Sequence, residues 1–111
     1  MLAAQHRMRS SQDFLLVRRN GNKVVLPGLI IYIYCGFYPD GICRVGLTVG
    51  KDCGNSVHRH RISRHIREAI RPVVEQLPAG SGVVVKALPA IANTRVDSNV
   101  VTSALLAKVG L

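Results

Sequence analysis

Residues 50–71 read GKDCGNSVHRHRISRHIREAIR, a stretch in which a turn leads into a helix with two contrasting sides. Asn55 or Ser56 is expected to cap the start of this helix. Successive residues of an α-helix are rotated by about 100°, so five apolar residues fall within roughly a third of the helix circumference. They form an apolar stripe: Ile62, Ile66, Ala69, Ile70 and Val73. The opposite side collects the arginine ridge, which consists of His60, Arg61, Arg64, Arg67 and Arg71. The stretch therefore predicts a helix that buries its stripe and exposes its ridge.

The charge of the arginine ridge indicates a partner that carries negative charge. Like charges three or four residues apart cost a helix about 0.2–0.5 kcal/mol per pair, and only Glu68 lies among them. A solvated helix surface is one interpretation. The charge of the whole chain favours a second interpretation, a surface that binds a negatively charged partner. The chain has 15 Lys and Arg against 6 Asp and Glu, a net charge of +9 over 111 residues. Such an excess points to a polyanion, nucleic acid first, and a membrane surface is disfavoured because the stripe lacks Trp and Phe anchors.

Length and cysteine usage indicate one intracellular domain, residues 1–111. The 3 cysteines, Cys35, Cys43 and Cys53, are odd in number and form no CxxC pair, so reduced thiols are expected in place of a disulfide framework or a zinc site. Residues 1–14 contain no continuous apolar core of signal-peptide length. The longest apolar run, residues 29–35, is too short to cross a bilayer, and we expect a cytoplasmic protein without membrane contact.

The remaining pattern predicts a mixture of helices and strands. A short first helix around Phe14 is expected to be capped by Ser10 or Ser11 and ended by Gly21. Pro72 is expected to bend or end the basic helix. Apolar and β-branched runs predict strands at 24–26, 29–35, 44–50 and 83–88, and a weaker amphipathic pattern predicts a last helix at 95–109.

Two of these strands have faces suited to a groove. In RVGLTVG (44–50), Gly46 and Thr48 form a face with almost no side chains, while Tyr32 and Tyr34 share one face of the preceding strand. If these faces lie side by side, the sheet presents a shallow trough floored by glycine and flanked by rings, on which single-stranded bases can stack. Alternatively, the tyrosines pack under a helix.

Together these features resemble the protein subunit of bacterial ribonuclease P over nearly the whole chain. The most specific part is RVGLTVGKDCGNSVHRHRISRHIRE (44–68), which resembles the family's glycine-containing strand, its turn and its arginine-rich helix with the RNR motif. RMRSSQDF (7–14) is similar to the basic opening and first helix, and VVVKALP (83–89) to the late buried strand. His60 stands where many members have the motif asparagine, Ser63 where lysine is common, and Arg18 where a second aromatic is frequent.

The resemblance implies a small α+β fold: helix, three strands, long basic helix, strand and helix around one mixed sheet, with a left-handed crossover that sequence rules would not predict. It implies RNA contacts from Lys51, Asn55, Arg59, Arg61, Arg64 and Arg67. His60 departs from the family motif, but it lies among these arginines and is expected to be a further RNA donor. The resemblance also implies a cleft for the 5′ leader of the substrate, lined or bordered by Phe14, Tyr32, Tyr34, Gly46 and Thr48.

The implied partners are the catalytic RNA subunit and precursor transfer RNA. In this family the RNA subunit performs hydrolysis with bound Mg²⁺, while the protein supplies binding and electrostatics. No catalytic residue and no metal ligand are therefore expected on the protein. Its carboxylates agree, because no paired spacing for a metal cluster occurs among Asp13, Asp40, Asp52, Glu68, Glu75 and Asp97.

Two other functions stay open at this point. A generic basic RNA-binding module, such as a ribosomal protein, would share the charge without needing the turn. A protein-only nuclease would use His58, His60 or His65 as a general base, although no partner nucleophile or carboxylate is identifiable. A metal site built from Cys53, His58 and His60 is disfavoured, since the two histidines diverge by about 200° on a regular helix.

Overall fold

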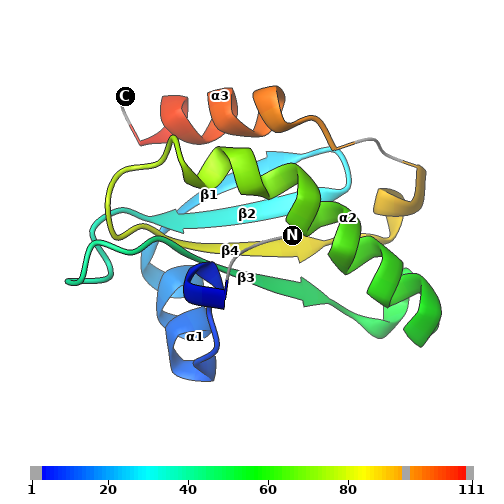
Figure 1. Ribbon diagram of the computed structural model, residues 1–111. Coiled ribbons are helices and arrows are strands. Elements are labelled where there is room, and N and C mark those ends of the chain that lie inside the picture. The colour runs from blue at the N-terminus through cyan, green and yellow to red at the C-terminus, as the bar shows by residue number, and fades with distance from the viewer. Residues whose placement is uncertain (1–3, 94–95, 110–111) are drawn as a thin grey trace.

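A four-stranded mixed sheet separates two helical layers in the computed structural model, which describes residues 4–93 and 96–109 (Figure 1). The strands lie in the order β1-β2-β4-β3. Their bounds are β1 Asn22–Leu26, β2 Leu29–Tyr34, β3 Arg44–Val49 and β4 Gly82–Ala87. The helices are α1 Ser11–Asn20, α2 Ser56–Val74 and α3 Ser98–Lys108, with short 3₁₀ turns at Ala4–His6 (η1), Lys51–Cys53 (η2) and Pro89–Asn93 (η3).

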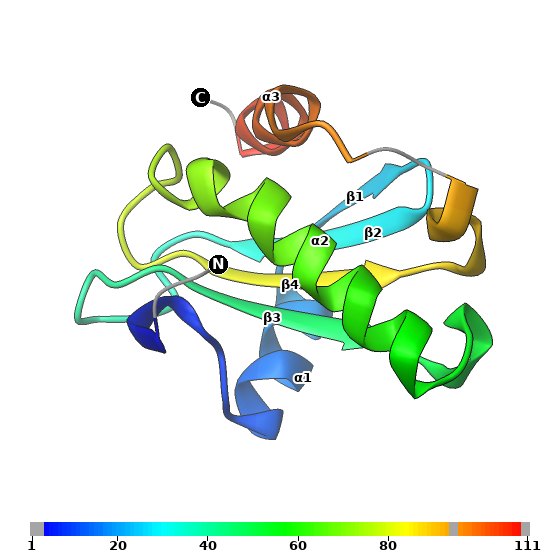
Figure 2. The ribbon, with the colours of Figure 1, turned by 45° about the vertical axis from the view of Figure 1, so that its right-hand side comes forward.

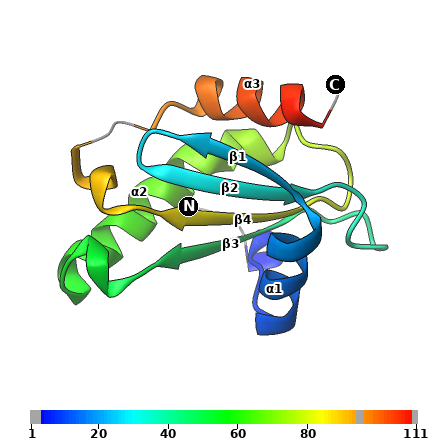
Figure 3. The ribbon, with the colours of Figure 1, turned by 180° about the vertical axis from the view of Figure 1, so that it is seen from behind.

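The helices cover the two faces of the sheet unequally. Helices α2 and α3 lie together over one face, whereas α1 lies on the other face, against β2 and β4 (Figures 1 and 3). We call the latter the α1 face. It carries Ile30, Tyr32, Tyr34, Gly46, Thr48, Gly82, Val84 and Lys86.

The order of the strands places β4, last in sequence, between β2 and β3. It pairs antiparallel with β2 and parallel with β3, and α2 makes the connection from β3 to β4. In Figure 1 both parallel strands run to the right with α2 in front of the sheet, and β4 lies above β3, so the crossover is left-handed. Nearly all such crossovers have the opposite hand. The predicted α+β fold with its left-handed crossover is confirmed.

The apolar stripe of α2 forms the centre of the larger core. Ile66 and Ile70 are each 1% exposed and Val73 is 0% exposed, which confirms the centre of the predicted stripe, while Ile62 and Ala69 are half-buried. They pack with the inward residues of the strands, namely Leu29, Ile31, Ile33, Val45, Val83, Val85 and Ala87. Burying side chains of this size stabilises the fold by about 1.5–3 kcal/mol each. Because one side of α2 is fixed in this way, the opposite side has to face outward.

Several helix ends agree with the sequence pattern. The Ser10 hydroxyl accepts a hydrogen bond from the Asp13 N–H at 3.3 Å and caps α1, as predicted. Helix α2 ends at Val74, two residues beyond Pro72, because Val73 and Val74 are buried in the core and hold the last turn in place. Helix α3 begins at Ser98, where the Asp97 carboxylate accepts from the Asn99 N–H at 2.8 Å. The earlier start predicted at Arg95 lies outside the described residues.

A small polar cluster attaches α1 to the loop between β2 and β3. The Tyr38 hydroxyl donates to Asp13 Oδ2 at 3.2 Å, and the Arg44 guanidinium lies 4.4 Å from the centre of the Tyr38 ring. Asp40 holds Arg44 in place with two hydrogen bonds, the shorter of 2.7 Å. Burial, and then the charge of Asp13, raises the pKa of Tyr38 to about 12.

The Tyr38 cluster predicts that the fold becomes less stable in alkali. A phenol whose pKa is about 10 in the unfolded chain and about 12 in the folded one stabilises the fold fully below pH 10, and this contribution disappears between pH 10 and 12. We expect Tyr38→Phe to lower the free energy of unfolding at pH 7 by about 0.5–1.5 kcal/mol. Urea unfolding at several pH values is the measurement. The stability difference between the two proteins should shrink above pH 10, and parallel pH profiles would contradict the assignment.

Candidate nucleic-acid interface

Helix α2 crosses diagonally in front of the sheet (Figure 2). The arginine ridge lies on the side of this helix opposite the buried stripe. His60, Arg61, Arg64 and Arg71 are exposed, and Arg67 is half-buried. Glu68 is the only acidic residue within Ser56–Val74. The ion pair of Arg44 with Asp40 belongs to the α1 face and leaves the ridge untouched. The ridge therefore presents a dense row of guanidinium groups to the surroundings of the protein.

The turn before α2 positions its first residues through a helix cap. The Asn55 side-chain oxygen accepts from the His58 N–H at 3.0 Å, and the Asn55 carbonyl accepts from the Arg59 N–H at 2.9 Å. Gly54 has a φ of 126°, a conformation that side-chain-bearing residues rarely adopt. Asn55 thus has a structural role as the helix cap, and it is exposed. Lys51 is exposed on η2 beside this turn.

Arg59 differs from the ridge arginines. It sits in the first turn of α2 and is half-buried, with its Nε enclosed and without a hydrogen-bond partner in the part of the chain that the structure describes. The stem of Arg59 thus packs against protein, on the side of the apolar stripe. Of the predicted RNA-binding residues, Arg61 and Arg64 are placed on the open ridge, and Arg59 is set apart from them.

The proposed trough differs from the arrangement that the sequence suggested. Strand β4 lies between β2 and β3, so Gly46 pairs with Val84 and Val84 pairs with Tyr32. Gly46 and Tyr32 are therefore two strands apart, about 10 Å, and the expectation that their faces lie directly side by side is wrong. A long-range strand insertion of this kind leaves no local signal in the sequence.

Gly46 also does not form an open floor, because the Phe14 ring covers it. A Cβ atom built on Gly46 would meet Phe14 ring carbons at 2.3 and 2.5 Å, so only glycine allows the ring to lie so close to β3. Phe14 and Tyr32 pack around Val84 and Val17 in the smaller core under α1. Tyr32 accordingly packs under α1, as the alternative interpretation expected, but it is only half-buried, so part of its ring stays accessible.

Tyr34 and Thr48 lie apart from this group. Tyr34 is 36% exposed and packs edge-to-face against Phe37 with ring centres 5.3 Å apart. Thr48 pairs with Lys86, which pairs with Ile30, two rows farther along the sheet. Four of the five predicted cleft residues, Tyr32, Tyr34, Gly46 and Thr48, thus lie on one face of the sheet. Phe14 reaches this face from α1, covers Gly46 and shares the small core with Tyr32.

The structure brings cations to the α1 face and to the outer edge of β3 that the sequence pattern did not single out. Lys86 is half-buried between Ile30 and Thr48, and its signal was a single lysine inside the apolar run VVVKA. At the edge of β3, a hollow of about 210 Å³ is lined by Arg7, Met8, Arg9, Phe14, Val45, Gly46, Leu47 and Arg67. This hollow connects the arginine ridge with the α1 face, through Arg67 on one side and Phe14 on the other.

Other kinds of site find no support in the described part of the chain. Among residues 4–93 and 96–109, no three His, Cys, Asp or Glu side chains are arranged to hold a metal ion. No described helix combines the length and apolar character that a bilayer crossing requires.

Comparisons with known proteins give the same picture. Residues 2–108 match the model of the ribonuclease P family. The chain is 35% identical to the ribonuclease P protein component of Mycolicibacterium paratuberculosis over 97% of this chain and 87% of the relative. It is 41% identical to that of Mycolicibacterium vanbaalenii over 80% of this chain and 76% of the relative.

Solved structures share the fold. The ribonuclease P protein of Thermotoga maritima superposes with a TM-score of 0.67 at 27% identity, covering 91% of this chain and 92% of that one. That of Staphylococcus aureus superposes with a TM-score of 0.71 at 22% identity, covering 95% and 93%. The ridge, the turn, the fold and the sequence relatives agree, and a generic basic module or a protein-only nuclease is not favoured. The chain belongs to the ribonuclease P protein family, the protein component of the endoribonuclease that matures the 5′ end of transfer RNA.

Proposed function

We propose that the arginine ridge binds the catalytic RNA of the ribonuclease P particle, while the α1 face holds the 5′ leader of precursor transfer RNA. The observation that carries the first part is the outward position of Arg61 and Arg64 on a helix whose only acid is Glu68. Guanidinium groups bind phosphate oxygens and release counterions from RNA, which supplies affinity without reading sequence.

The hollow at the edge of β3 supports a continuous path between the two RNAs. Arg7, Arg9 and Arg67 line it, so an RNA strand can pass from the ridge side of the molecule to the α1 side along cationic groups. On the α1 face, Tyr32, Thr48 and Lys86 lie on neighbouring strands and offer a ring, a hydroxyl and a cation to an unpaired leader. In this proposal Lys51, Asn55, Arg59 and His60 add contacts around the start of α2.

Catalysis is assigned to the RNA partner in this proposal. Mg²⁺ bound by the catalytic RNA would carry the hydrolysis, and the protein would reduce repulsion between two polyanions and hold the leader. The location implied for such a particle is the cytoplasm. Purified protein tested on precursor transfer RNA with and without the catalytic RNA checks this division: stimulation of the RNA is expected, and cleavage by protein alone would contradict it.

The ridge makes a prediction about salt dependence. Arg61→Ala with Arg64→Ala is expected to weaken assembly with the catalytic RNA and to flatten the slope of log K against log salt concentration by about 0.7–0.9 for each phosphate that is no longer bound. Arg19→Ala with Lys108→Ala is the matched control, because it removes two exposed cations on other helices. Filter binding over a salt series gives both slopes. Equal slopes for the two variants would show that only net charge matters.

The α1 face makes a prediction about substrate choice. Replacing Tyr32 and Tyr34 by leucine keeps apolar bulk but removes the rings, and each ring that stacks on a leader base contributes about 1–3 kcal/mol. The particle should therefore lose its preference for precursor over mature transfer RNA, while assembly with the catalytic RNA is unchanged. Competition binding of the two substrates measures the preference.

Lys86→Gln tests the same surface without disturbing the core under α1, with Lys108→Gln on the opposite layer as its control. Affinity for the leader-bearing substrate should fall in the first variant only. If both tyrosine and Lys86 variants keep the wild-type preference, the leader does not lie on this face.

A further inference from the structure

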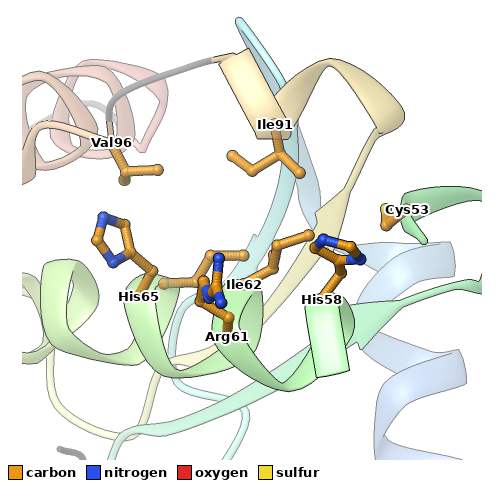
Figure 4. Close-up of a pocket in the computed structure, with 8 residues that line it drawn as sticks. Cys53, His58, Arg61, Ile62, His65, Ile91 and Val96 are labelled. Atoms are coloured by element: carbon orange, nitrogen blue, oxygen red, sulfur yellow. The ribbon is translucent and has the colours of Figure 1, made fainter. Parts of the chain in front are cut away.

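A second hollow lies on the other side of α2, where the helix faces η2 and the segment after β4 (Figure 4). Its volume is about 250 Å³. Figure 4 shows His58 and His65 at its two ends with Arg61 between them, and Ile91 and Val96 across from the helix. The full lining consists of Cys53, His58, Arg61, Ile62, His65, Ile66, Ile91 and Val96.

The lining combines an apolar floor with a rim of rings and hydrogen-bond donors. Ile62, Ile66, Ile91 and Val96 supply the floor, and no carboxylate belongs to the described residues that line it. The Cys53 thiol donates to the Ala87 carbonyl at 3.6 Å, and burial raises its pKa, so it adds no negative charge at neutral pH. These groups fit a flat, mostly apolar ring that carries an anionic group at one end.

The size of the hollow restricts the ligand further. Sites for drug-sized molecules span about 300–1,000 Å³, so a hollow of about 250 Å³ takes a single ring system. His58 and His65 are separated by about 10.5 Å along the helix axis, since seven residues each rise about 1.5 Å. A nucleobase lying on the floor of the hollow can contact an imidazole at either end, and unpaired RNA bases commonly stack on His rings and Arg guanidinium planes.

Arg61 belongs both to the arginine ridge and to this hollow. His58, Arg61 and His65 follow the i, i+3, i+7 spacing and share one side of α2, directly beside the ridge. An RNA strand whose phosphate contacts Arg61 therefore has its attached base within reach of the hollow. A phosphate site and an apolar ring site that share one arginine match the two ends of a nucleotide.

We propose that this hollow binds one unstacked nucleobase of the RNA held by the arginine ridge. The inference rests on the ridge binding RNA, and it adds a site that recognises a base in place of the backbone. His58 and His65 contact the base from the two ends of the hollow, and Arg61 contacts the adjoining phosphate. The isoleucines of the floor exclude water from the face of the base.

The test uses the full chain and two probes that differ only in the base. Adenosine 5′-monophosphate carries a purine and ribose 5-phosphate does not, and NMR spectra of the histidine rings are recorded at fixed pH during titration with each. We expect ring-current shifts at His58 and His65 with the purine probe alone, whereas His60 on the ridge responds to both probes alike. Binding of the purine probe should be about 5- to 150-fold tighter, the factor that corresponds to about 1–3 kcal/mol of base stacking. Equal responses of His58 and His65 to both probes would reduce the hollow to an anion site and overturn the proposal, as would no response to either.

A second measurement separates the hollow from the ridge in the assembled particle. His58→Ala with His65→Ala removes two exposed rings but no arginine, so it should weaken binding of the catalytic RNA about 5-fold or more and change the salt slope less than the ridge variant does. Val96→Phe, which narrows the mouth of the hollow, should have the same effect. If these variants bind the catalytic RNA as wild type does while Arg61→Ala with Arg64→Ala is impaired, the base-binding proposal is overturned and the RNA-binding role of the ridge is supported. If the ridge variant keeps its slope while the purine-specific shifts remain, the hollow binds a base, but the assignment of the RNA phosphates to the ridge is overturned.

Discussion

Burial of one stripe of α2 against the sheet is the constraint on which the rest of the structure depends. Ile66, Ile70 and Val73 are almost completely enclosed, and a helix with one side fixed cannot rotate. The arginines half a turn away must then face outward whatever the repulsion between them. Apolar burial of several kcal/mol outweighs repulsion of a few tenths of a kcal/mol per pair, so the core holds a charged surface ready for a polyanionic partner.

The unusual crossover explains how the two surfaces proposed to bind RNA can lie on opposite faces of one sheet. Because β4 returns between β2 and β3, strand β3 becomes an edge, and the N-terminal segment reaches it through the Met8 N–H, which donates to the Val45 carbonyl at 2.9 Å. Arg7 and Arg9 are thereby brought to the same edge as Arg67. The edge strand joins the α2 side to the α1 side, and a more central β3 would have separated them.

Much of this arrangement could be predicted from the sequence because its causes are local. The period of the isoleucines, the cap at Asn55 and the alternation in β2 each act over a few residues, and each was confirmed. The contacts that depend on distant segments could not be predicted. The insertion of β4, the Phe14 ring over Gly46 and the hollow between His58 and Val96 all bring together residues separated by more than thirty positions. The two helical residues after Pro72 also depend on distant contacts, because burial of Val73 and Val74 in the core outweighs the tendency of proline to end a helix.

The outward ridge can be tested most directly by photocrosslinking from two matched positions. Val57 at the start of the ridge is 65% exposed and Val100 on α3 is 52% exposed, so a photoreactive benzoylphenylalanine at either site should leave the fold intact. After assembly with the catalytic RNA, irradiation should link the RNA to position 57 and leave position 100 unmodified. Equal crosslinking from both positions, or none from position 57, would contradict the account.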